Sequence, residues 1–138
     1  MSRTEQERTR RRDIVDAANG IRAARAVIYD NVHGMTLAES TDLGGAVLEY
    51  AHARDWAVAE VLTDDCPLDT PRDERPAWSM VATLVEDPDA AVTLIVCSNL
   101  DHIAPAADLP ALYNWLDTLV AHVHVPEYLP GLTERTAS

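Results

Sequence analysis

The sequence predicts an α/β fold with three layers, α/β/α, around a mainly parallel sheet of four to five strands. From residue 26 onward, short apolar runs rich in β-branched residues alternate with longer segments whose apolar residues recur at helical spacing. This alternation is typical of βαβ units, in which a helix joins two parallel strands. A length of 138 residues with 47% hydrophobic residues is enough for one packed core.

The apolar runs also predict where the strands lie and where the domain begins and ends. We expect one domain over residues 25–126, preceded by a helical extension over 1–24 and followed by an irregular tail over 127–138. The expected strands cover about 26–31, 56–62, 91–97 and 121–125.

Three segments between these strands carry apolar stripes that predict core-facing helices. The second segment begins after Pro76, a residue suited to the first turn of a helix. Trp115 lies off the third stripe, so we expect it to be half-buried or part of an interface. The stripes comprise Leu43, Val47, Tyr50 and Ala51; Trp78, Val81, Ala82 and Val85; and Leu109, Leu112, Tyr113, Leu116, Leu119 and Val120.

The charge of the chain argues against general binding to polyanions. Its 23 acidic residues against 11 basic ones, all arginine, give a net charge of -12, which repels nucleic acid and anionic membrane surfaces. One basic segment, Arg8 with residues 10–12, leaves open a DNA-associated regulator that uses its arginine-rich N-terminus. We otherwise expect no DNA or membrane partner, since no apolar run approaches the roughly 20 residues of a membrane span.

The cysteines and histidines outside the strand ends predict little chemistry. Two cysteines are too few for a disulfide framework, and the N-terminus lacks the apolar stretch of a secretion signal, so we expect a cytoplasmic, reduced protein. We expect Cys97 to be buried and Cys66 to be more exposed. His122 and His124 share one face of a short strand, and we expect them to point outward from an exposed edge strand.

Two connections, 63–75 and 98–108, are long for βα units and follow the carboxyl ends of strands, where ligands usually bind in open α/β sheets. Around them, the stretch 25–125 resembles the N-terminal catalytic domain of the resolvase/invertase, or serine recombinase, family. That resemblance implies a resolvase-like sheet with flavodoxin-like strand order. The similar pieces, in the family's order, are residues 47–58, Asp64-Asp65, Arg75-Pro76-Ala77-Trp78 and Leu100-Asp101.

The differences from the family's motifs imply that this chain lacks the family's chemistry. In that family a serine attacks a DNA phosphate to form a phosphoserine link, and arginines hold the phosphate oxygens. Of the phosphate-binding set only Arg75 is in register, so we expect no catalytic residue. Where the family has Tyr-x-Arg-Val-Ser and Leu-Asp-Arg-Leu-x-Arg, this chain has Tyr29-Asp30-Asn31-Val32-His33 and Leu100-Asp101-His102-Ile103-Ala104-Pro105.

The leading interpretation is a catalytically inactive serine-recombinase-like domain, not an enzyme, that acts through protein–protein interaction or self-association as a dimer. We expect its cleft to repel DNA, because several carboxylates surround one arginine. We also expect no DNA-reading module, since the sequence ends soon after its fourth strand. The vestigial cleft comprises Asn31, His33, Asp64, Asp65, Arg75, Asp101 and His102.

The alternative from another class is a small-molecule or metal-dependent enzyme that uses the strand-end cleft. Its polar groups would be His33, His102, Asp64 and Asp101, and imidazole with carboxylate suits zinc and related ions. The spacing of these residues is not a metal motif, so we predict no metal site and no cofactor. The two interpretations differ in whether the four side chains converge within hydrogen-bonding reach.

Overall fold

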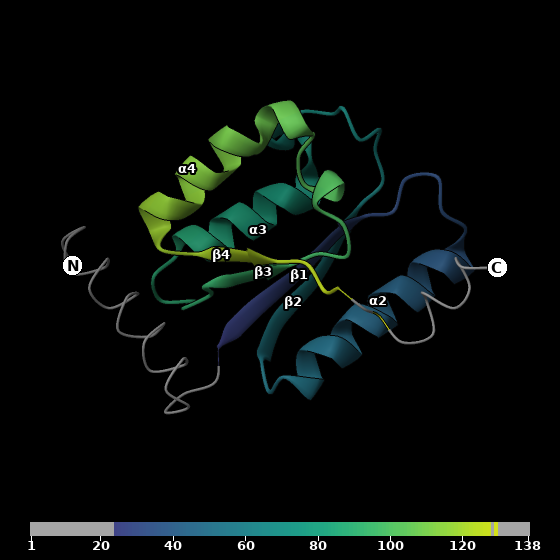
Figure 1. Ribbon diagram of the computed structural model, residues 1–138, viewed down its shortest axis with the longest axis horizontal. Coiled ribbons are helices and arrows are strands. Elements are labelled where there is room, and N and C mark those ends of the chain that lie inside the picture. The colour runs from purple at the N-terminus through teal and green to yellow at the C-terminus, as the bar shows by residue number, and fades with distance from the viewer. Residues whose placement is uncertain (1–23, 128, 130–138) are drawn as a thin grey trace.

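The computed structural model describes residues 24–127 and 129, and these form a three-layer α/β/α structure around a parallel sheet (Figure 1). The four strands lie in the order β2-β1-β3-β4. This is the start of the flavodoxin-like 2-1-3-4-5 order, so the predicted fold class is confirmed. The strands are β1 (Arg25–Asn31), β2 (Ala57–Asp64), β3 (Leu94–Val96) and β4 (His122–His124).

All four predicted strands are present, although β3 and β4 are shorter than expected. The predicted extension over 1–24 lies outside the described residues except for Ala24, and so does the arginine-rich segment 8–12. The predicted tail over 127–138 is described only at Glu127 and Leu129. Within the described residues, no helix is long and apolar enough to cross a membrane.

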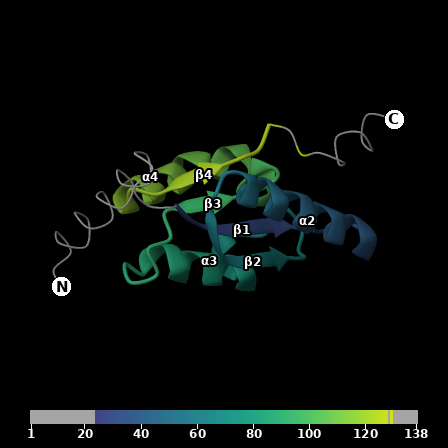
Figure 2. The same cartoon turned by 90° about the horizontal axis from the view of Figure 1, so that it is seen from below.

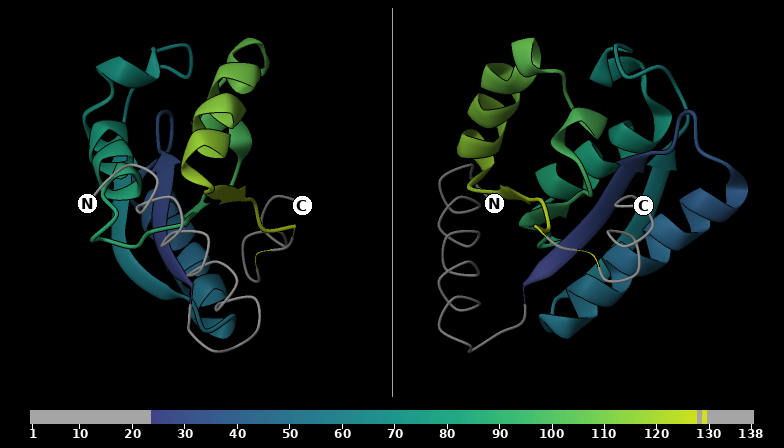
Figure 3. Two further views of the ribbon diagram at one scale, coloured as in Figure 1. Left: turned by 90° about the vertical axis from the view of Figure 1, so that its left-hand side faces the viewer. Right: turned by 45° about the vertical axis from the view of Figure 1, so that its right-hand side comes forward.

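Alternation along β1 divides the core between the two faces of the sheet. Ala26 and Ile28 pack toward α2 (Leu37–Ala53), while Val27 and Tyr29 pack toward α3 (Pro76–Glu86) and α4 (Leu109–Leu119). Figure 2 shows α2 on one side of the sheet and α3 with α4 on the other. The two views in Figure 3 show the same arrangement of layers. Both faces of β1 are therefore buried, as the central strand of a three-layer fold requires.

The helix α2 begins with a capping box that the sequence supplies. The Thr36 side chain accepts from the Glu39 backbone N–H at 3.1 Å, and the Glu39 carboxylate accepts from the Thr36 N–H at 3.1 Å. On the inner face of the helix, Leu43, Val47 and Ala51 are buried as predicted. The backbone amides of Thr36 and Glu39 are thus satisfied reciprocally, and the apolar stripe then fixes which face the helix turns to the sheet.

The helices α3 and α4 confirm most of their predicted stripes. Trp78, Val81, Val85, Leu112 and Leu116 are buried. The remaining members of the stripes are partly buried or exposed. Ala82 and Tyr50 are partly buried, Leu109 and Leu119 lie at the core's margin, Tyr113 is 46% exposed, and Val120 is the left-handed C-cap of α4.

Tyr113 and Val120 therefore correct the third stripe. Tyr113 directly follows buried Leu112, and successive residues of a helix lie about 100° apart, so its side chain turns away from the core. Val120 has a φ of 53°, which ends the helix. Trp115 is half-buried, as one of the two predicted alternatives had it, and its ring lies 5.9 Å from that of Trp78.

Of the two histidines of the edge strand β4, one points outward as predicted and the other does not. His122 is exposed, but His124 packs between Tyr50 and Trp56, with ring centroids 5.5 and 5.1 Å away. The Tyr50 hydroxyl lies 2.8 Å from the His124 Nε2. Burial and the nearby Arg54 lower the pKa of His124 below its ordinary value. The expectation that both histidines point into solvent is therefore wrong for His124, because α2 and the segment after it cover that face.

Candidate functional site

The strand-end cleft lies beyond the carboxyl ends of β1, β2 and β3, at the point where the strand order reverses between β1 and β3. Its walls are the two long connections that the sequence predicted. The first contains a short 3-10 helix over Arg72–Glu74, and the second contains two, over Leu100–His102 and Ala106–Asp108. The predicted site residues thus lie at or near the sheet edge where ligands bind in open α/β folds.

Arg75 is the most deeply buried cation of the cleft, with 1% of its surface exposed. Its Nε donates to the Thr70 carbonyl at 3.0 Å, and its Nη2 donates to the Leu68 carbonyl at 2.9 Å. Its Nη1 donates to the His102 carbonyl and, at 3.4 Å, to the Tyr29 hydroxyl. The guanidinium thus ties the two long connections together through backbone acceptors, which leaves it no open face for a phosphate.

Asp64 is a helix cap. Its Oδ1 accepts from the Ala77 N–H at 2.9 Å, and its Oδ2 accepts from the Trp78 N–H at 3.0 Å and from the Tyr29 hydroxyl at 2.8 Å. A carboxylate at this position satisfies the first amides of α3 and complements its dipole. Burial raises the pKa of Tyr29 above its ordinary value, so the phenol stays a neutral donor to Asp64.

Asp30, Ser98 and His102 form a closed triangle at the carboxyl ends of β1 and β3. The Asp30 Oδ1 accepts from the Ser98 hydroxyl at 2.7 Å and the Ser98 N–H at 2.9 Å, and it lies 2.7 Å from the His102 Nδ1. The Ser98 Oγ lies 3.3 Å from the same Nδ1. In a nucleophilic relay the serine and the carboxylate contact opposite ring nitrogens, whereas here both contact one. The serine hydroxyl therefore points at a carboxylate and is not set up to attack a substrate.

The remaining predicted residues lie apart from one another. Asn31 is buried and bridges to Cys66, donating to its carbonyl at 2.8 Å. His33 and Asp65 form a pair on the surface, with Nδ1 and Oδ1 3.0 Å apart and side chains 50% and 72% exposed. Asp101 is exposed, outside these contacts. The expectation that carboxylates surround the arginine is wrong for Asp65 and Asp101. Asp65 pairs with His33 at the surface, and the side chain of Asp101 is exposed.

The polar groups of the alternative interpretation do not converge. His33 pairs with Asp65, His102 with Asp30, and Asp64 with α3. Among residues 24–127 and 129, no group of three histidine, cysteine or acidic side chains is placed to hold a metal ion. As predicted, Cys97 is buried and Cys66 is partly exposed. Burial raises the pKa of Cys97, which keeps it a neutral thiol.

Sequence reasoning missed Tyr29, Asp30 and Ser98 as members of the site. Each was visible as a polar residue at the end of an apolar strand, next to the point where the strand order reverses. Their mutual contacts join residues 68 and 35 positions apart, for Ser98 with Asp30 and for Tyr29 with Asp64. The parallel pairing of β1 with both β2 and β3 was needed to bring them together.

The fold and site define an α/β protein of flavodoxin-like strand order whose cleft is closed by internal hydrogen bonds. Two solved structures are similar to it. The C-terminal catalytic domain of ISC1926 TnpA, an IS607-like serine recombinase, has a TM-score of 0.61 and 23% identity, over 81% of this chain and 77% of that one. The N-terminal catalytic domain of TP901-1 integrase has a TM-score of 0.60 and 20% identity, over 73% and 75%.

These likenesses place the chain's fold among the catalytic domains of serine recombinases. No protein-family profile matches the sequence, and no curated protein matches it. The resemblance inferred from the short motifs therefore agrees with the tertiary structure at the level of the fold.

Proposed function

We propose that this protein is a recombinase-fold domain without strand-transfer activity that acts by binding protein, including a second copy of itself. The observation that carries the proposal is the occupancy of Arg75. Its guanidinium donates to three backbone carbonyls and to the Tyr29 hydroxyl, and Arg75 is only 1% exposed, so it is not accessible to a phosphodiester. His33 and Asn31 stand where the resemblance leads one to expect the nucleophile and an arginine.

Repulsion of DNA by the rest of the cleft supports the same proposal. Asp30 and Asp64 lie at the strand ends that form the cleft, and the side chain of Asp30 is only 3% exposed. A buried carboxylate next to a polyanion is strongly repelled, because the repulsion between like charges grows as the local dielectric constant falls. Transfer of a DNA strand through a phosphoserine link would also need cations around the phosphate, and the one buried arginine among the described residues already donates to protein groups.

Supercoiled plasmid DNA tests the absence of strand transfer. The full chain, incubated with plasmid and quenched with detergent, should give no nicked product and no covalent protein–DNA adduct, while an active serine recombinase run in parallel gives both. The His33→Ser variant should also give no adduct, because restoring a hydroxyl does not restore the missing arginines. An adduct with the unaltered chain would overturn the proposal.

Light scattering after size-exclusion chromatography tests the self-association. The full chain should elute with the mass of a dimer at micromolar concentration. A monomer at every concentration tested would remove self-association and leave only a different protein as partner.

A further inference from the structure

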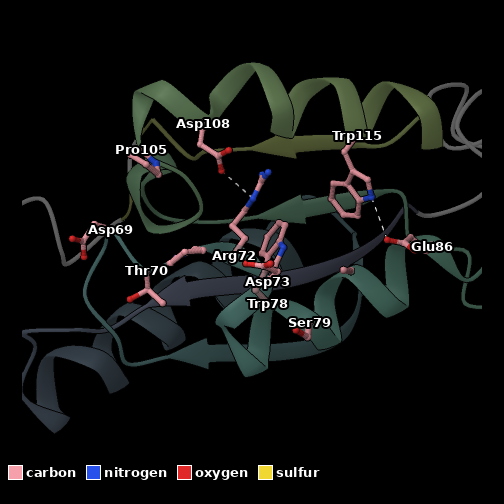
Figure 4. Close-up of a pocket in the computed structure, with 12 residues that line it drawn as sticks. Asp69, Thr70, Arg72, Asp73, Trp78, Ser79, Glu86, Pro105, Asp108 and Trp115 are labelled. Carbon is pink, nitrogen blue, oxygen red and sulfur yellow. Dashed lines mark hydrogen bonds and ion pairs between the residues drawn. The ribbon is translucent and has the colours of Figure 1, made fainter.

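A groove of about 700 Å³ lies between α3, α4 and the connections that precede them (Figure 4). None of Asp30, Ser98 and His102 lines this groove, and the proposal that strand transfer is absent does not depend on it. Trp78 and Trp115 form its apolar wall, and Figure 4 shows Trp115 reaching from α4 toward α3. A volume of this size is in the range of pockets that bind ligands in proteins.

The charge of the groove is acidic. Four carboxylates, those of Asp69, Asp73, Glu86 and Asp108, line it together with one guanidinium, that of Arg72. The guanidinium is already paired, with its Nε 3.2 Å from the Asp108 Oδ2. Glu86 accepts from the Trp115 Nε1 at 3.2 Å. Asp69 and Asp73 are exposed, and within the described part of the chain neither forms an ion pair with a basic side chain.

Three classes of occupant meet this lining differently. An anion would face an excess of three negative charges, since Arg72 is neutralised by Asp108. A purely apolar ligand would fill the tryptophan wall but would desolvate Asp69 and Asp73 without compensation. An arginine or lysine side chain satisfies both features, because its stem packs on the partly exposed Trp115 indole while its charged head reaches a carboxylate of the lining.

We propose that this groove binds an arginine-bearing segment of a partner protein. The inference rests on the proposed protein-binding function and names the chemistry of the partner. Arginine suits the site better than lysine, because its planar guanidinium stacks on tryptophan and pairs with carboxylates through two N–H groups at once. The groove runs from Asp69 and Thr70 at one end to Trp115 and Glu86 at the other, so it accommodates an extended segment with more than one basic residue (Figure 4).

Fluorescence anisotropy with a labelled peptide of four arginines separated by alanines tests the proposal on the full chain. The Asp69→Asn/Asp73→Asn double variant should weaken binding about tenfold or more. Both residues lie exposed in a connection, so this variant keeps the fold. The Trp115→Leu variant should weaken binding too, because the apolar wall is lost. The matched control is Glu49→Gln/Glu60→Gln, which removes the same charge from exposed positions outside the groove and should bind like the unaltered chain.

Several outcomes would overturn the inference. Equal weakening by the groove pair and the control pair would mean that the peptide senses only net charge, and unchanged binding by Trp115→Leu would place it elsewhere. If the peptide instead dissolves a dimer that the groove variants cannot form, the occupant is a second copy and not a different protein. Absence of peptide binding with a persistent dimer would remove this inference alone, whereas plasmid cleavage would remove the proposed function alone.

Discussion

Arg72 and Arg75 lie three residues apart, at the start of one 3-10 turn and just after it, yet they belong to opposite kinds of surface. Arg75 is 1% exposed and donates only to neutral groups in the strand-end cleft. Arg72 lies in the open groove, pairs with Asp108, and has a buried Nη1 without a partner among the described residues. In the cleft most polar groups satisfy one another, although the buried Asp30 Oδ2 has no hydrogen-bond partner among the described residues. In the groove Asp69 and Asp73 are exposed and outside any ion pair among the described residues, so the groove has free bonding capacity for a ligand.

The surroundings of Arg72 hold its side chain against the wall of the groove. Burial lowers the pKa of Arg72, and the nearby Arg75 lowers it further, while Asp108 raises it. Its guanidinium also lies over the Trp78 ring, with the Cζ 5.8 Å from the ring centroid. The side chain is therefore held in place by the wall of the groove and by one carboxylate. Substitutions in the closed cleft and in the open groove should therefore differ in their effect on the free energy of unfolding.

The largest effect is expected from Arg75→Met. The change removes the buried guanidinium and leaves the carbonyls of Leu68, Thr70 and His102 without their donor, which should cost about 3–5 kcal/mol in the free energy of unfolding. Urea denaturation followed by far-UV circular dichroism measures the loss. The control is Arg54→Met, whose guanidinium lies over the exposed side of the Tyr50 ring and should cost about 1 kcal/mol or less. A fully stable Arg75→Met variant would contradict the structural role of this arginine.

A smaller loss is expected from Asp64→Ala, which removes the cap of α3 and the acceptor of Tyr29. The expected cost is about 2–4 kcal/mol, since two helix amides and a buried hydroxyl lose their partner. Asp65→Ala is the matched control, because its pair with His33 is exposed and should contribute less than about 1 kcal/mol. Equal losses in the two variants, measured by urea denaturation, would mean that the cap contributes nothing.

The decrease in the free energy of unfolding at alkaline pH should depend on Tyr29. Its pKa in the folded chain is raised above the ordinary value of about 10, so the unfolded chain loses this proton first as pH rises. The stabilisation is complete below pH 10 and decreases above it. Denaturation midpoints between pH 9 and 11 should fall more steeply for the unaltered chain than for Tyr29→Phe. Parallel slopes would show that the phenol does not titrate differently in the two states.

The smallest effect on stability is expected from the groove. Asp69→Asn/Asp73→Asn should change the free energy of unfolding by no more than about 0.5 kcal/mol, because both carboxylates are exposed and outside any ion pair among the described residues. Thermal denaturation measures this directly. A loss of several kcal/mol would mean that these carboxylates hold the fold together, and the contrast between the closed cleft and the open groove would fail.

The sequence by itself determined the fold class and most of the core. Apolar runs placed all four strands, and helical stripes placed buried residues such as Val47, Val81 and Leu116. These features are local: a period of two or 3.6 residues fixes the face that is buried, whatever the partner across the core. The absence of a serine and of three arginines at the expected motif positions is likewise a property of the sequence alone.

Only the tertiary structure decided what the polar residues do. The sequence motif placed Arg75 in register with a phosphate ligand of the family. In the structure its guanidinium instead donates to carbonyls on two separate connections and joins them. Asp30, Ser98 and Tyr29 joined the site because parallel pairing brings strand ends together that are far apart in the sequence. The groove also needs α3 and α4 side by side. Hydrogen bonds and cavities depend on distances of a few ångströms between remote segments, which no local pattern encodes.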